Sequence, residues 1–79
     1  MGQVYYVRIL PKAEVLDVQG RAVYQMLKAH QFPIQKVRVG KLIEVELEEN
    51  IKDAKSVFQH MIKEGLYNPL VETAEVEGL

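Results

Sequence analysis

Residues 54–62 have the sequence AKSVFQHMI, in which apolar side chains recur every three or four positions. The members of this stripe are Ala54, Val57, Phe58, Met61 and Ile62. Such spacing is typical of an amphipathic α-helix that buries one face. Asn50 is the predicted N-cap of this helix, with Asp53 at the third helical position in a capping-box arrangement.

A second helix is predicted over residues 18–30, with Asp17 as its N-cap. Its apolar stripe consists of Ala22, Val23, Met26, Leu27 and His30. Gly20 lies early in this helix, where alanine would be the better helix former by about 1 kcal/mol. We therefore expect another backbone to pass close to the Cα atom of Gly20.

Residues 4–10 alternate between apolar and polar side chains, which is typical of a half-buried strand. On one face of this strand lie Tyr5, Val7 and Ile9. Pro11 ends the strand because proline has no N–H to donate. A last strand with weaker alternation is predicted over residues 70–76, and residues 77–79 are expected to fray.

Residues 36–47 also alternate, and they predict a hairpin whose turn lies around Gly40 and Lys41. The register of the hairpin must keep the apolar side chains of both strands on one face. That register places two basic residues opposite two acidic ones. The expected pairs are Arg38 with Glu44 and Lys36 with Glu46.

These elements follow the order β-α-β-β-α-β, which is the ferredoxin-like order. We expect one α+β domain over residues 1–79, in which a four-stranded antiparallel sheet carries both helices on one face. So short a chain buries only a small core, and it has no cysteine for a disulfide. Oligomerisation is therefore the support that we expect.

The composition excludes several kinds of partner. The net charge is -1, with 10 basic and 11 acidic side chains, so the chain has no long-range attraction for nucleic acid. No apolar run approaches the roughly 18 residues that span a bilayer. Residues 1–10 lack a basic segment and a cleavage site, so we expect no signal peptide and a cytoplasmic protein.

Few side chains suggest chemistry. Ser56, the single serine, lies four residues from His60, but no motif supports a nucleophile–base pair. His30 ends the first predicted helix, where it suits the negative end of the helix dipole. The two histidines form no ligand set for a metal ion. We therefore predict that this chain has no catalytic residue and binds no cofactor or metal.

Three other patterns have plain interpretations as well. Residues 39–41, VGK, lack the glycine pattern of a phosphate-binding loop. Tyr5 and Tyr6 resemble the stacking aromatics of RNA-binding sheets, but the basic and aromatic signature of those domains is missing. Neighbouring glutamates, such as those at 48 and 49, suit a solvated surface.

Three segments of the chain resemble the PurS family. Residues 16–23, LDVQGRAV, are similar to the family's LDPQG-x-AV helix start, and residues 37–44, VRVGKLIE, are similar to its VRVGK hairpin. Residues 66–72, LYNPLVE, are similar to its Asn-Pro segment. The order of the segments and the total length fit the family. Val18 in place of the usual proline and Gly65 in place of a common leucine affect the expected helix ends only.

The resemblance implies a small, non-catalytic subunit of phosphoribosylformylglycinamidine synthase, an enzyme of de novo purine biosynthesis. It implies that the chain binds itself, as a dimer or tetramer. It also implies that the chain bridges the large synthetase subunit, PurL, and the glutamine amidotransferase subunit, PurQ, so that ammonia passes between them. ATP, magnesium and the glutaminase cysteine would then belong to the partners.

Carried onto matching positions, the resemblance implies partner-binding or structural roles for nine residues. They are Asp17, Gln19, Gly20, Arg21, Arg38, Gly40, Lys41, Asn68 and Pro69. The element order leaves open an alternative, an ACT-like regulatory domain that binds amino acids between subunits. A small stand-alone enzyme and an RNA-binding domain are further alternatives.

Overall fold

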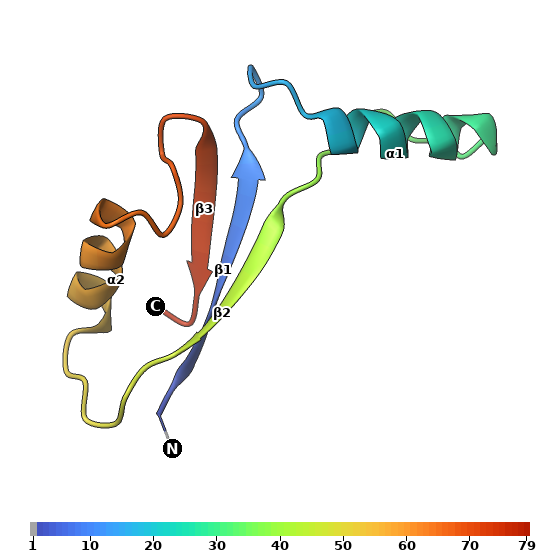
Figure 1. The fold of residues 1–79 in the computed structure, drawn as a ribbon. Helices are drawn as coiled ribbons and strands as arrows, with labels where there is room; N and C mark the ends of the chain where they lie inside the picture. The colour runs from blue at the N-terminus through green and yellow to red at the C-terminus, as the bar shows by residue number, and fades with distance from the viewer. Residues whose placement is uncertain (1) are drawn as a thin grey trace.

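The computed structural model describes residues 2–79. Its elements, in chain order, are β1 (Val4–Pro11), α1 (Val18–Ala29), β2 (Lys41–Glu46), α2 (Ala54–Lys63) and β3 (Glu72–Glu77). The three strands form one antiparallel sheet in the order β2-β1-β3 (Figure 1). The molecule is elongated, with extents of 50 × 27 × 14 Å. The α+β class is confirmed.

The core lies between α2 and one face of the sheet. Tyr5, Val7 and Ile9 alternate along β1 as predicted and are buried. Phe58 of α2 is 1% exposed, and its ring meets the Tyr5 ring edge-on, with the centroids 5.1 Å apart. Half-buried apolar residues of β2, α2 and β3 surround these four. Of the α2 stripe that the sequence predicted, Phe58 is buried and the other four residues are half-buried.

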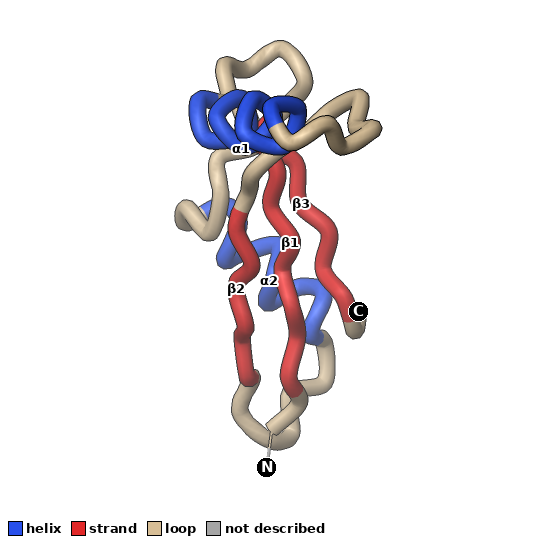
Figure 2. The backbone as a smooth tube through the Cα atoms, turned by 90° about the vertical axis from the view of Figure 1, so that its right-hand side faces the viewer, coloured by secondary structure: helices blue, strands red, loops and turns tan. Residues whose placement is uncertain are grey.

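Helix α1 has a different environment. Figures 1 and 2 show α1 projecting across one end of the sheet, while α2 lies along a face of the strands. Within residues 2–79, the core cluster includes no residue of α1. Leu16, just before α1, is 75% exposed, and Val18 and Met26 of α1 are 67% and 51% exposed. The prediction of two helices on one face of the sheet is therefore wrong.

The predicted hairpin over residues 36–47 is also wrong. Strand β2 begins at Lys41 and pairs with β1, where Tyr6 lies opposite Glu44. Residues 36–40 form no strand and instead lead from α1 into β2. The expected pairing of Arg38 with Glu44 is therefore replaced by pairing between β1 and β2, as is that of Lys36 with Glu46. The sheet consequently has three strands, where four were predicted.

The cap of α2 differs from the prediction as well. Asp53 is the N-cap, and its Oδ1 accepts a hydrogen bond from the Ser56 N–H at 3.1 Å. Asn50 has a φ of 66°, which places it in the left-handed region of a turn before the helix. Asparagine is one of the few residues that adopts this conformation readily. The predicted capping box therefore lies one turn too early.

The face of the sheet away from α2 is open and acidic. Arg8 lies at its centre and forms an ion pair with Glu77, with Nη2 and Oε2 2.8 Å apart. Tyr6 lies between Glu44 and Glu77. A hydrogen bond to Glu44, together with the negative charge of both glutamates, raises the pKa of Tyr6. This face therefore carries more negative than positive charge.

Candidate functional site: the α1 junction

Several of the predicted site residues meet where the chain enters and leaves α1. We call this the α1 junction, defined by Asp17, Gly20, Val39, Gly40 and Lys41. One carboxylate oxygen of Asp17 accepts from the Gly20 N–H at 2.8 Å, which caps α1. The other accepts from the Val39 N–H at 2.9 Å. One carboxylate thus joins the start of α1 to the segment that returns to β2.

Both glycines of the junction are close to other backbone atoms. A Cβ on Gly20 would lie 2.9 Å from the carbonyl oxygen of Val37 and would overlap the Asp17 carboxylate. A Cβ on Gly40 would overlap the carbonyl oxygen of Ile9. The close approach predicted at Gly20 is confirmed, and Gly40 is a second such position. The predicted turn at Gly40 is instead the point where β2 begins against β1.

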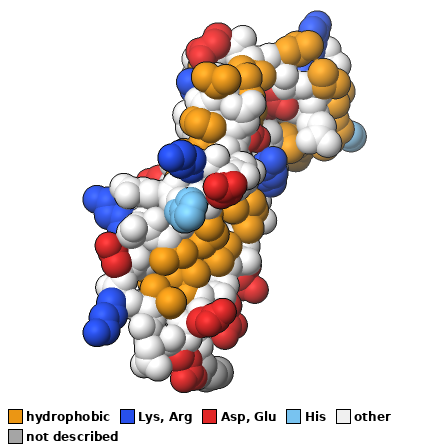
Figure 3. Space-filling view, turned by 60° about the vertical axis from the view of Figure 1, so that its left-hand side comes forward, with side chains coloured by type: hydrophobic (Ala, Val, Ile, Leu, Met, Phe, Trp, Pro, Cys, Tyr) orange, Lys and Arg blue, Asp and Glu red, His pale blue; other side chains and the backbone are white. Residues whose placement is uncertain are grey.

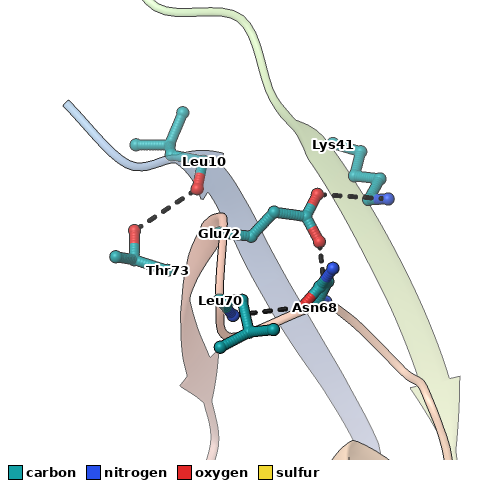
Figure 4. Close-up of polar contacts among 6 residues, drawn as sticks. All are labelled: Leu10, Lys41, Asn68, Leu70, Glu72 and Thr73. Atoms are coloured by element: carbon teal, nitrogen blue, oxygen red, sulfur yellow. Dashed lines mark hydrogen bonds and ion pairs between the residues drawn. The ribbon is translucent and has the colours of Figure 1, made fainter. Parts of the chain in front are cut away.

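A second polar chain connects the junction to β3 (Figure 4). Lys41 Nζ lies 3.4 Å from Glu72 Oε2, and Glu72 Oε1 accepts from the Asn68 N–H at 2.8 Å. The side chain of Asn68 in turn accepts from the Leu70 N–H at 3.0 Å. The Asn68 N–H and, less strongly, Lys41 lower the pKa of Glu72, although partial burial opposes them. Charge and hydrogen bonds thus connect β2 to the turn before β3.

The comparisons with known proteins agree with this arrangement. A family model described as PurS, phosphoribosylformylglycinamidine (FGAM) synthase, matches residues 4–79. The chain belongs to the PurS family. It is a PurS-type subunit of phosphoribosylformylglycinamidine synthase, in purine biosynthesis, as the resemblance implied. The ACT-like alternative is set aside by this match.

Relatives of known name and structure cover nearly the whole chain. The PurS subunit of the synthase from Thermotoga maritima is 34% identical over 70 residues, which is 86% of this chain and 85% of the relative. A crystal structure from the same organism has a TM-score of 0.83 and 31% identity, covering 96% of this chain and 90% of that one. The crystal structure of B. subtilis PurS has a TM-score of 0.78 and 31% identity, and the match covers 94% of both chains.

The structure brings together some of the nine predicted PurS residues and separates others. Asp17, Gln19, Gly40 and Lys41 line one hollow of about 400 Å³, which Glu72 borders as well. Arg38 donates from Nη1 to the Pro11 carbonyl oxygen at 3.0 Å, beside this hollow. Gly20 is buried in the α1 junction, and the remaining three members of the set lie further out. Arg21 is exposed on α1, and Asn68 and Pro69 lie in the exposed turn before β3.

Two contributors were missed by sequence reasoning. Glu72 ends the third PurS-like segment, and its place beside the Asn-Pro pair was the available signal. Val39 contributes only its backbone N–H, and no pattern of side chains predicts that contact. The partner-binding roles of the nine residues stay predictions, while the contacts above give Asp17, Gly20, Gly40 and Lys41 a structural role.

Ser56 and His60, the residues considered as a nucleophile–base pair, both lie on α2. Ser56 and His60 both border a shallow groove on α2, but His60 Nε2 faces Glu64 Oε1 at 3.6 Å. Among residues 2–79, no group of three or more His, Cys, Asp or Glu side chains is placed to hold a metal ion. Neither α1 nor α2 is long and apolar enough to cross a membrane.

Acid should loosen the α1 junction. The Val39 N–H and then the Gly20 N–H hold the pKa of Asp17 below its ordinary value. A carboxyl group whose pKa falls on folding stabilises the fold above its unfolded pKa, and this contribution disappears as the pH falls through the folded pKa. We expect the helical signal of α1 to weaken below about pH 4. The Asp17→Asn variant should already show the weaker signal at pH 7 and a flatter acid profile in circular dichroism, unlike Glu14→Gln.

Proposed function

We propose that this PurS-type chain is an assembly subunit with no active site of its own. The proposal is carried by the hydrogen bonds of Asp17 and Glu72, which hold α1 and the turn before β3 in place. Helix α1 also has apolar surface that the core does not cover. Polar groups engaged in structural bonds are poorly placed for chemistry. Exposed apolar surface of this kind suits contact with other subunits.

The proposed partners are the synthetase subunit, PurL, and the glutamine amidotransferase subunit, PurQ. The complex would convert formylglycinamide ribonucleotide, glutamine, ATP and water into formylglycinamidine ribonucleotide, glutamate, ADP and phosphate. ATP, magnesium and the glutaminase cysteine would lie in the partners, since this chain has no cysteine. By bridging them in the cytoplasm, this subunit would position the two sites so that ammonia passes without loss to water.

We also propose that the chain binds itself, as a dimer or a tetramer. A 79-residue chain whose core includes only one of its two helices has little apolar burial of its own. A rigid pair of copies would also present the same surface twice, which suits a bridge between two enzymes.

Reconstitution tests the subunit role. The purified chain should show no synthase activity, and adding it to PurL and PurQ should restore glutamine-dependent turnover. Ser56→Ala, His30→Ala and His60→Ala should each leave the restored rate within a few-fold, because none of these side chains is assigned chemistry. Full glutamine-dependent turnover without the chain, or loss of turnover in all three variants, would contradict the proposal.

A further inference from the structure

One segment, which we call the arm, leaves the sheet and returns to it. The arm comprises residues 12–40, carries α1, and joins the end of β1 to the start of β2 (Figure 1). Within residues 2–79, the core cluster includes no residue of the arm. Figure 3 shows the upper lobe of the molecule, to which the arm belongs, set off from the lower lobe, with charged side chains of both signs where the lobes meet. The direction of the arm therefore depends on the contacts at its two ends.

The start of the arm is bonded to the turn before β3. Pro11 lies opposite Glu72 at the end of the β1–β3 pairing. The pairing continues one step further, because the Lys12 N–H donates to the Val71 carbonyl oxygen at 2.9 Å. The carbonyl oxygen of Asn68 accepts from the Val71 N–H at 3.1 Å and from the Glu72 N–H at 2.8 Å, which closes the turn. The arm thus begins on a turn that hydrogen bonds hold in one shape.

The end of the arm is tied to the same turn through a carboxylate. Lys41 begins β2 and Glu72 begins β3, and these two strands lie on either side of β1. Their side chains meet with Nζ and Oε2 3.4 Å apart, and the other oxygen of Glu72 accepts from the Asn68 N–H at 2.8 Å (Figure 4). The Glu72 side chain is only 20% exposed, so water competes less for its charge than at an exposed surface pair.

These bonds share their members, and we call the set the clasp. The clasp consists of Lys12, Lys41, Asn68, Val71 and Glu72. The two ends of the arm are also joined to each other, since Asp17 accepts from the Val39 N–H at 2.9 Å and Arg38 donates to the Pro11 carbonyl oxygen at 3.0 Å. Loss of the Glu72 carboxylate would therefore remove one tie to the arm and weaken the turn that makes the other.

The turn of the clasp is open to contact from outside. Leu70, at its tip, is 81% exposed, more than any other large apolar side chain of residues 2–79. The Leu70 N–H donates to the Asn68 side chain at 3.0 Å, and the Asn68 N–H donates to Glu72. A force on Leu70 is therefore passed through Asn68 to the carboxylate that holds the end of the arm.

We propose that the clasp is a latch on the arm and that the turn at residues 68–71 releases it. In the closed state, which the structure shows, the clasp holds α1 across the end of the sheet. When the turn is displaced, both ties to the arm are lost, and the arm swings about Pro11 and Gly40, where it leaves the sheet. This device does not depend on the subunit role proposed above.

Coupling of this kind must act in both directions. A change on the turn should loosen a hydrogen bond of the arm, and a change on the arm should loosen the turn by the same factor. If the ties were independent, each change would affect only the bonds that it removes.

Amide hydrogen exchange on the full chain tests the coupling. Glu72→Ala should speed exchange of the Val39 N–H roughly tenfold, although that N–H is bonded to Asp17 and not to Glu72. Asp17→Asn should speed exchange of the Asn68 N–H, which is bonded to Glu72, by the same factor. Glu75→Ala removes the same charge from an exposed position of the same strand, and it should leave both amides unchanged.

A milder variant protects the test against unfolding. Lys41→Met removes the ion pair alone, and it should speed exchange of the Val39 N–H in the same direction but by a smaller factor. Exchange of the Val7 N–H, in the buried part of β1, reports on the core and should stay at the native rate in every variant.

Spin labels report the direction of the arm, because the chain has no native cysteine. Lys28→Cys on α1 and Lys55→Cys on α2 are both exposed sites for the labels. The labelled chain is diluted with unlabelled chain, so that each distance lies within one molecule. We expect a narrow distance distribution that becomes roughly twice as broad with Glu72→Ala and stays narrow with Glu75→Ala.

The outcomes separate a latch from a set of independent contacts. A native exchange rate at Val39 together with a narrow distance distribution in Glu72→Ala overturns the latch, as does a native rate at Asn68 in Asp17→Asn. If Glu72→Ala does not fold, a native rate at Val39 in Lys41→Met overturns it. None of these results affects the subunit role, which reconstitution tests separately.

Discussion

Replacing Phe58 with alanine should lower the free energy of unfolding by about 3–5 kcal/mol. Phe58 is 1% exposed and is the one buried residue of α2, and its ring packs edge-on against Tyr5. Removing the ring leaves a cavity between α2 and β1 that the small core cannot fill by collapse. Domains of this size have only a few kcal/mol of stability to lose. We therefore expect the isolated variant to be largely unfolded at 25 °C by circular dichroism.

Leu70→Ala is the matched control for Phe58→Ala. Leu70 is also a large apolar residue, but it is 81% exposed in the turn before β3. Its replacement should change the stability by no more than about 0.5 kcal/mol. Equal melting of the two variants would show that α2 contributes little to the fold.

The sequence predicted this core because its signals are periodic. Strand β1 buries the three residues that alternation selected, and α2 buries Phe58 from the centre of its predicted stripe, with the rest of that stripe half-buried. Each pattern depends only on residues that are close in the sequence, and β1 and α2 pack against each other. Where an apolar stripe packs within the same chain, periodicity is enough to identify the buried residues.

The prediction of a hairpin over residues 36–47 was wrong for a different physical reason. Residues 36–47 alternate over their whole length, and period-two alternation does not distinguish one long extended run from two short strands. The pattern predicts a turn at Gly40, yet glycine is needed there because the carbonyl oxygen of Ile9 on the neighbouring strand leaves no room for a Cβ. A glycine marks either freedom of the backbone or a close approach, and the sequence alone does not separate the two.

The position of α1 was beyond sequence reasoning as well. Of the stripe that helical spacing predicted, Val23 and Leu27 are half-buried, whereas Ala22, Met26 and His30 are exposed. Periodicity could not separate these two groups, because it does not indicate what covers a helix face. At the junction, local signals selected Asp17 and Gly20, and the family resemblance selected Gly40 and Lys41 as well, although 24 positions separate the ends of this set.

Substitution of Gly20 should release α1 from its junction. Gly20 is buried, and a Cβ there would lie 2.9 Å from the Val37 carbonyl oxygen and overlap the Asp17 carboxylate. That oxygen belongs to a backbone and cannot turn aside as a flexible side chain can. Gly20→Ala should therefore destabilise α1, although alanine is the better helix former by about 1 kcal/mol. For Gly20→Leu we expect a net cost of about 1–3 kcal/mol, typical of overpacking.

The effect should be local, because the core includes no residue of α1. Thermal melting of the core is thus the less sensitive measurement, and amide hydrogen exchange in α1 is the sharper one. A cost of about 1–3 kcal/mol corresponds to exchange that is roughly five- to 150-fold faster in α1, with β1 unchanged. Gln25→Ala, at an exposed position of the same helix, should leave exchange equal or slightly slower. If both Gly20 variants protected α1 as well as Gln25→Ala does, the carbonyl of Val37 would not constrain this helix, and the junction would not set its direction.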